Sequence, residues 1–243
     1  MLLDQYADKL ISVIGDIRDT QRESILAAAK LAADTICHDG IIYVFGSGHS
    51  HLLAEEVFYR AGGLACVAPI LNEPLMLHES AVNSSTLEKT FGLASSLLAE
   101  YDFGPHDLLI VISNSGVNAV PVEFAVEAKE KGLKVIGISS GACGNIPPRN
   151  KYDLHLSQAA DLSIDNRVPY GDACLQPEGL EIKMTPVSTV AGSYILHSIL
   201  SEAVQLAVNA GVDVPIYTSA NIPGGSQKNQ ALLERYMPRI RCL

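Results

Sequence analysis

Residues 41–50 read IIYVFGSGHS, and this stretch decides the fold class. Residues 41–45 are β-branched or aromatic, which favours a buried strand. Residues 46–50 comprise two glycines, two serines with hydroxyl groups and a histidine, and residues 51–60 continue at helical spacing. The order of buried strand, short polar loop and helix is typical of an α/β protein with a parallel sheet.

The same unit occurs again further along the chain. A strand is expected at residues 107–112, followed by SNSG at 113–116, a helix at 120–131 and a strand at 133–138. This alternation predicts a doubly wound, Rossmann-like parallel sheet flanked by helices, with helical N- and C-terminal additions. We expect a single domain over residues 1–243, with a core at about 36–215 between a helical extension (1–35) and a C-terminal tail (216–243).

The segments between these units give weaker signals. The pattern predicts a loop at 69–80, a helix at 85–100, short strands at 153–156 and 162–164, and a helix at 188–210. Residues 165–176, DNRVPYGDACLQ, are too polar and too interrupted by Pro and Gly to form an element, yet long for an idle loop. We expect this segment to lie at the rim of a pocket.

Composition excludes several classes of protein. Apolar residues make up 48% of the chain, and no apolar run approaches the roughly 18–20 residues of a membrane helix. The net charge of −10 disfavours nucleic acid as a partner. The first ten residues, MLLDQYADKL, lack a secretory pattern, so we expect a cytoplasmic protein. The five scattered cysteines show no metal-binding spacing, and we expect neither a metal nor a cofactor.

The two loops contain the residues that a phosphate group requires. Glycine lets the backbone approach an anion closely, and N–H groups at a helix start point toward it. Serine and asparagine add side-chain donors, so an acidic protein can hold phosphate without lysine or arginine. The candidate binding residues are Ser47, Gly48 and Ser50 in the first loop and Ser113, Asn114 and Ser115 in the second.

Other phosphate and nucleophile motifs do not fit. GSGHS lacks the G-x-G-x-x-G spacing of a dinucleotide site, and the chain contains neither G-x-x-x-x-G-K-[ST] nor a suitable G-x-S-x-G elbow. The remaining alternative is that both loops are ordinary tight turns, since Gly and Ser are common in turns.

These motifs resemble the SIS (sugar isomerase) family, whose pattern has G-x-G-x-S after one strand and S-x-S-G after a later one. A Thr/Ser-rich entry to a late helix is also part of that pattern, and here it reads TPVST at 185–189. The resemblance covers about residues 36–215 and is greatest to a single-domain branch. It implies that a sugar phosphate lies among Ser47, Ser50, Ser113, Ser115 and Thr189, with Ser188 beside them, and that the protein is a homodimer or homotetramer.

Aldose–ketose isomerisation needs a base beside the carbonyl carbon and a group that moves protons between oxygens. His78 and Glu79 resemble an acidic, histidine-bearing loop of some SIS isomerases, so we expect Glu79 as the base and His78 as the proton shuttle. The alternative for both residues is that they are ordinary polar side chains of a solvent-exposed loop. Glu55 is the next candidate, although Glu55 and Glu56 point about 100° apart on a helix and at most one can face the pocket.

His49 occupies a position where some SIS isomerases have lysine, and a protonated imidazole there would attract the ligand. His197, on the late helix, is a further candidate, with a packed core histidine as the alternative. The chain departs from the family after SNSG, where Val117 and Asn118 stand in place of an isomerase glutamate. The interpretation is a phosphosugar isomerase, with an etherase-like lyase and a non-catalytic sugar-phosphate sensor left open.

Overall fold

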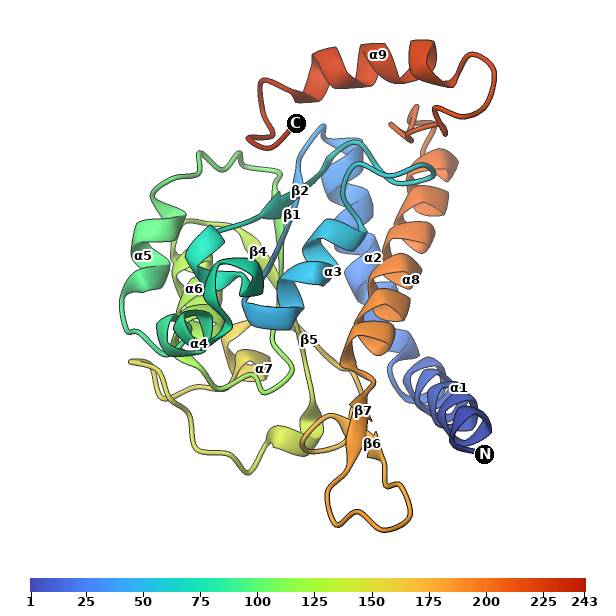
Figure 1. Cartoon of the computed structure of the whole chain (residues 1–243). Helices are drawn as coiled ribbons and strands as arrows, with labels where there is room; N and C mark the ends of the chain where they lie inside the picture. Colours follow the sequence, from blue (N-terminus) through green and yellow to red (C-terminus); the bar gives the residue numbers. More distant parts are fainter.

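The computed structural model describes residues 1–243 and contains a five-stranded parallel sheet at its centre (Figure 1). Its spatial order is β2-β1-β3-β4-β5, so the chain moves outward from β1 in one direction and from β3 in the other. This confirms the doubly wound α/β fold. The strands are β1 (Ile42–Gly46), β2 (Val67–Ile70), β3 (Leu108–Ile112), β4 (Lys134–Ser139) and β5 (Leu162–Asp165).

Helices cover both faces of the sheet. On one face α2 (Arg22–Cys37) packs along α8 (Ser188–Asn209), and α1 (Leu2–Thr20) projects beyond them toward the N-terminus (Figure 1). On the other face α6 (Ala119–Glu130) lies over β3 and β4. The remaining helices are α3 (His51–Glu56), α4 (Leu77–Leu87), α5 (Leu93–Leu98), α7 (Leu156–Ala159) and α9 (Gly225–Tyr236).

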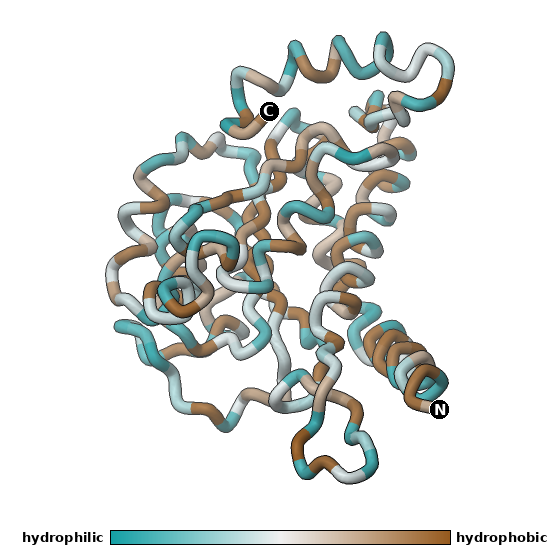
Figure 2. The backbone as a smooth tube through the Cα atoms, in the orientation of Figure 1, coloured by the Kyte–Doolittle hydropathy of each residue, from teal (hydrophilic) through white to brown (hydrophobic).

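Burial explains why the central strands are apolar throughout. All five residues of β1 and of β3 are buried, because helices shield both sides of the sheet. Figure 2 shows brown stretches along the strands at the centre of the molecule, while α9 is mixed and more hydrophilic. No helix in the chain combines the length and hydropathy required of a membrane span.

The order of the strands also predicts where a ligand binds. In a doubly wound sheet, ligands bind beyond the carboxyl ends of the strands at the point where the winding direction reverses. Here that point lies between β1 and β3, which are paired from Ile42–Leu108 to Gly46–Ile112. The loops GSGHS and SNSG follow these two strands, so the fold brings them together.

The structure corrects the expected helix at 85–100. It forms two helices instead, α4 and α5, and α4 begins at Leu77 inside the expected loop. The break falls before Gly92, which has a left-handed backbone (φ 80°) and donates its N–H to Glu123 Oε2 at 2.7 Å. The buried Glu123 carboxylate therefore fixes a chain reversal that local spacing does not show.

Two further expectations are also wrong. Residues 165–176 do contain an element, because β6 (Ala173–Leu175) pairs antiparallel with β7 (Met184–Pro186) in a small hairpin. Residues 153–156 form no strand, and α7 begins at Leu156. In both places the long-range pairing or packing partner decides the conformation, and that partner is not visible in the local sequence.

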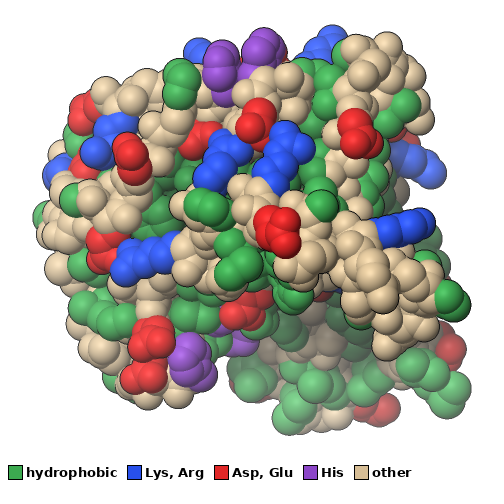
Figure 3. All heavy atoms as spheres, turned by 90° about the horizontal axis from the view of Figure 1, so that it is seen from above, with side chains coloured by type: hydrophobic (Ala, Val, Ile, Leu, Met, Phe, Trp, Pro, Cys, Tyr) green, Lys and Arg blue, Asp and Glu red, His purple; other side chains and the backbone are tan.

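The opposite edge of the sheet, where the strands begin, is covered by the C-terminal segment. Arg235 Nη2 lies 2.7 Å from Asp39 Oδ1, and Arg241 pairs with Glu100. Asp107 is buried and accepts from the backbone N–H groups of Ile41 and Gly104, both at 2.7 Å. The view from this end shows charges of both signs interspersed (Figure 3).

Candidate functional site

The GSGHS loop makes a tight turn at the end of β1. A Cβ on Gly46 would lie 2.6 Å from the carbonyl carbon of Ser50, so the loop folds back on a strand end that tolerates only glycine. Gly48 has a left-handed backbone with φ 55°. The ring of His51 is buried and contacts the carbonyl oxygen of Gly48, which gives this histidine a structural place in the loop.

The SNSG loop is constrained as well, although its close approach is less tight. Gly116 has φ 63°, and a Cβ there would lie 3.1 Å from the Cβ of Ser139. The backbone N–H of Gly116 donates to Ser113 Oγ at 3.2 Å, which leaves the Ser113 hydroxyl hydrogen available. Val117 is buried in the core, so the position next to this loop contributes no acid.

The two loops line one cavity of about 500 Å³, which we call the serine cavity. It lies at the carboxyl edge of β1 and β3, beside α4 and the segment before β6. The loop residues in its wall are Ser47, Gly48, His49, Ser50, Ser113, Asn114 and Ser115, and the others include Ser84, Ser85, Glu88, Asn118, Cys143, Tyr170 and Asp172. None of the residues lining it is lysine or arginine.

Several hydrogen-bond donors at this cavity have no acceptor within the protein. They include the backbone N–H groups of Ser47, Asn114 and Ser115 and the hydroxyls of Ser50 and Ser115. Backbone amides in a protein normally find a partner or water. A set of converging, unpaired donors is therefore suited to an anion with several acceptor oxygens.

Glu88, directly after α4, links the GSGHS loop to the residue that precedes α6. Its Oε2 accepts from Ser47 Oγ at 2.9 Å, and its Oε1 accepts from Asn118 Nδ2 at 2.5 Å. Sequence reasoning missed this residue because the local pattern predicts Glu88 within one continuous helix. Glu88 is thus an acidic residue of the cavity wall that lies far in sequence from the SNSG loop.

Asn118 is the residue before α6 and is only 9% exposed. Its Nδ2 is committed to Glu88, and its Oδ1 has no hydrogen-bond partner in the protein. The amide therefore keeps an unused acceptor at the wall of the serine cavity.

A smaller cavity of about 120 Å³ adjoins the serine cavity and shares His49, Ser50, Asn114 and Asp172 with it. Ser188 and Thr189 line this side cavity, so the structure brings both near the two loops. Asp172 accepts from the N–H of Ser188 at 2.9 Å and from its hydroxyl at 2.6 Å. The start of α8 is consequently capped by a carboxylate of the protein itself.

His78 and Glu79 are not among the residues that line these cavities. They lie in the first turn of α4 with side chains 58% and 56% exposed, and His78 Nε2 is 4.0 Å from Glu79 Oε1. The structure therefore places this pair outside the site, and their catalytic roles stay predictions.

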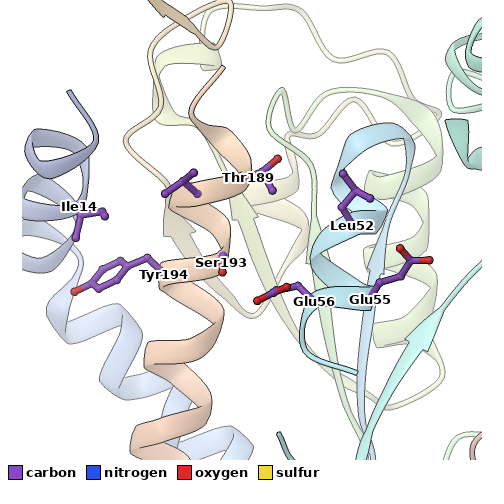
Figure 4. Close-up of a pocket in the computed structure, with 8 residues that line it drawn as sticks. Ile14, Leu52, Glu55, Glu56, Thr189, Ser193 and Tyr194 are labelled. Carbon is purple, nitrogen blue, oxygen red and sulfur yellow. The ribbon is translucent and has the colours of Figure 1, made fainter. Parts of the chain in front are cut away.

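Glu55 lies in a third cavity, of about 730 Å³, between α1, α3 and α8, where Glu56 points toward α8 and Glu55 points away (Figure 4). Thr189 lines both this groove and the side cavity. Glu56 Oε1 lies 3.1 Å from His197 Nε2, and this hydrogen bond, with the Arg60 charge, holds the pKa of Glu56 below its ordinary value against the effect of burial. Of the two adjacent glutamates, Glu56 is the one with a histidine partner.

Together the fold and the cavity define a doubly wound α/β protein with a serine-lined cavity at the switch point of its sheet. The chain belongs to the SIS domain family, whose model matches residues 5–140. The resemblance of the two loop motifs to that family is thereby confirmed.

Relatives extend over the whole chain. A UPF0309 protein of Listeria monocytogenes serotype 4b is 42% identical over 243 residues, which covers 100% of this chain and 98% of the relative. A UPF0309 protein of Halalkalibacterium halodurans is 44% identical, with 100% and 97% covered. Among solved structures, a phosphoheptose isomerase from Francisella tularensis superposes with a TM-score of 0.51 at 15% identity, over 84% of this chain and 96% of that one. This last likeness shows the fold.

Proposed function

We propose that the protein binds a sugar phosphate in the serine cavity and catalyses its aldose–ketose isomerisation. The observation that carries the binding is the set of unpaired donors, from Ser47, Ser50, Asn114 and Ser115, at the switch point of the sheet. A phosphate offers several acceptor oxygens to such donors, and the family assignment supports a phosphorylated sugar.

The acidic residues of the cavity do not oppose this proposal. Glu88 accepts from Ser47 and Asn118, and Asp172 accepts from the start of α8. Their oxygens already accept hydrogen bonds from groups of the protein, whereas the unpaired donors of the cavity wall belong to other residues. The phosphate is therefore expected beside Ser113 and Ser115, and the sugar hydroxyls toward the acceptors of Glu88.

We assign the proton transfer to Glu88, because this half-buried carboxylate lines the serine cavity. A base must come within hydrogen-bond distance of the proton that it removes. Glu88 lines the cavity in which the sugar is proposed to bind, whereas Glu79 is exposed and does not line it. The roles predicted for His78, Glu79, His49 and Glu55 are the alternatives to this assignment.

Binding is tested first, by thermal unfolding of the pure protein with a panel of sugar phosphates and the matching unphosphorylated sugars. A ligand that binds the native state raises the apparent melting temperature by mass action. We expect stabilisation by at least one phosphorylated member and none by its free sugar. If millimolar concentrations of every sugar phosphate leave the melting temperature unchanged, the phosphate site is refuted.

Turnover is tested in D₂O with the sugar phosphate that binds. An isomerase transfers a proton through its base, so NMR should show both the ketose and deuterium at the carbon beside the carbonyl. Glu88→Gln should lose this exchange by about 10²-fold or more while still binding, and Glu79→Gln should keep it. In the Glu88→Gln variant the amide oxygen can still accept from Ser47, and the new NH₂ group can donate to the unpaired Oδ1 of Asn118 after that amide turns.

The same experiment separates the alternative functions. An etherase-like lyase would release a second product from an ether-bearing sugar phosphate, and a sensor would bind without deuterium exchange. The Glu56→Gln variant is assayed in the same way, because Glu56 forms the carboxylate–histidine pair with His197. A homodimer or homotetramer and a cytoplasmic location remain predictions.

A further inference from the structure

Asn166 is buried below the serine cavity and belongs to none of the recognised motifs. It directly follows β5, is 2% exposed and lines the side cavity. Its backbone N–H donates to the carbonyl of Ser139 at 2.9 Å, so its position is fixed from β4.

The hydrogen bonds of Asn166 have a defined direction. The backbone N–H of Val168 can only donate, and it lies 3.1 Å from Asn166 Oδ1. This contact assigns the oxygen of the amide, and the other end of the same amide must then be Nδ2. Asn166 Nδ2 donates to Asn114 Oδ1 at 2.9 Å.

The orientation of the Asn166 amide fixes the orientation of the Asn114 amide in the SNSG loop. Because Asn114 Oδ1 accepts from Asn166, Asn114 Nδ2 is the group left without a protein partner, and Asn114 lines both cavities. A neutral amide can present either an acceptor or a donor to a ligand, and rotation by half a turn exchanges them. A backbone N–H of the loop after β5 thus selects the donor for a residue at the end of β3.

We propose that Asn166 is a positioning residue that sets Asn114 as a hydrogen-bond donor and so makes the SNSG loop selective for oxyanions. The inference rests on the proposed function, since it concerns the phosphate end of the same site. Asn166 itself touches no ligand in this scheme and acts through Asn114.

The test uses Asn166→Asp, which keeps the size of the side chain and removes its donor. The introduced carboxylate can still accept from Val168, but it turns the Asn114 amide round and leaves an acceptor facing the anion. With sulfate and inorganic phosphate as probes, we expect affinity at pH 7.5 to fall on the order of tenfold to a hundredfold. Asn166→Ala lets Asn114 adopt either orientation and should weaken binding less.

A pH series separates positioning from a merely structural effect. Once protonated, the introduced carboxyl group again carries a hydrogen for Asn114. Because burial raises the pKa of a carboxyl group, the sulfate affinity of this variant, expressed relative to wild type at the same pH, should recover as the pH falls from about 7.5 toward 5. Sulfate keeps its charge over this range. The matched control is Asn150→Asp, at a buried asparagine whose hydrogen bonds run to Val117, Leu154 and Tyr152. It should lower stability, and its affinity relative to wild type should not change with pH.

Each outcome decides the question. Unchanged affinity in both Asn166 variants, or an equal loss in both without recovery at low pH, overturns the inference while the phosphate site stands. If the wild type binds neither sulfate, inorganic phosphate nor any sugar phosphate, the proposed function fails and this inference with it. Should Asn166→Asp not fold, wild-type affinity in Asn166→Ala overturns the inference.

Discussion

Both edges of the sheet carry a carboxylate beside β1 and β3, and the donors to these two carboxylates differ. At the amino edge, Asp107 accepts from two backbone N–H groups, each at 2.7 Å. At the carboxyl edge, Glu88 accepts from two side chains, Ser47 and Asn118. Backbone donors are fixed by the fold, whereas side-chain donors can rotate. We infer that the amino edge is built for stability and the carboxyl edge for exchange with a ligand.

The largest expected effect comes from comparing one glycine of each edge, Gly46 and Gly104. Gly46→Ala places a methyl group 2.6 Å from the Ser50 backbone and should destabilise the protein by about 3 kcal/mol, with loss of ligand binding. Gly104→Ala is the control, since its Cβ would meet only the Asp107 carboxylate, with Oδ2 at 3.4 Å. Urea unfolding measures both, and equal destabilisation would show that the GSGHS loop is not specially constrained.

The sequence predicts the parts of the site that depend on local chemistry. Residues 41–50 and 108–116 each predict a strand and the polar loop that follows it. The positions of Ser47 and Ser115 at the switch point follow from these local patterns. Glu88 could not be found in this way, because the helix break beside it depends on Glu123, which lies 31 residues beyond Gly92. The hairpin of β6 and β7 likewise depends on pairing between residues outside the local window.

The next largest effect compares the carboxylates directly. Asp107→Asn leaves one backbone N–H facing an amide NH₂ in a buried place, so we expect about 2 kcal/mol of destabilisation. Glu88→Gln should cost less than about 1 kcal/mol, because its side-chain partners can turn to suit the amide. Unfolding curves of the two variants provide the comparison, and a larger loss for Glu88→Gln would reverse the proposed division between the edges.

A smaller effect is expected at Ser47. Ser47→Ala removes one of the two donors to Glu88, and the bond from Asn118 remains, so the loss of stability should be about 1 kcal/mol. Sugar-phosphate affinity should also fall, because the tie between the loop and Glu88 is lost. Calorimetry and ligand titration of one preparation measure both, and unchanged values would show that Glu88 does not tie GSGHS to the site.

The smallest effect lies at the amino edge and depends on pH. Burial raises the pKa of the Asp39 carboxyl, but Arg235 and Arg239 outweigh it and hold the pKa below its ordinary value of 3.8. The folded state therefore binds fewer protons than the unfolded state. The stability that Asp39 contributes is fully present above the ordinary pKa of 3.8 and is lost as the pH falls through the lower pKa of the folded state. The difference in melting temperature between wild type and Asp39→Asn should shrink below about pH 4. Since Asp39 is 54% exposed, added salt should reduce it as well.

The packing of α2 along α8 has a consequence for synthesis on the ribosome. Helix α8 begins about 150 residues after α2 ends, and the small buried residues of α2, among them Ala28 and Ala32, belong to the same core as α8. At a synthesis rate of about 5–20 residues per second, roughly 8–30 s separate the completion of α2 from the start of α8. During that interval the apolar face of α2 has no α8 to pack against, so this part of the core can form only late in synthesis.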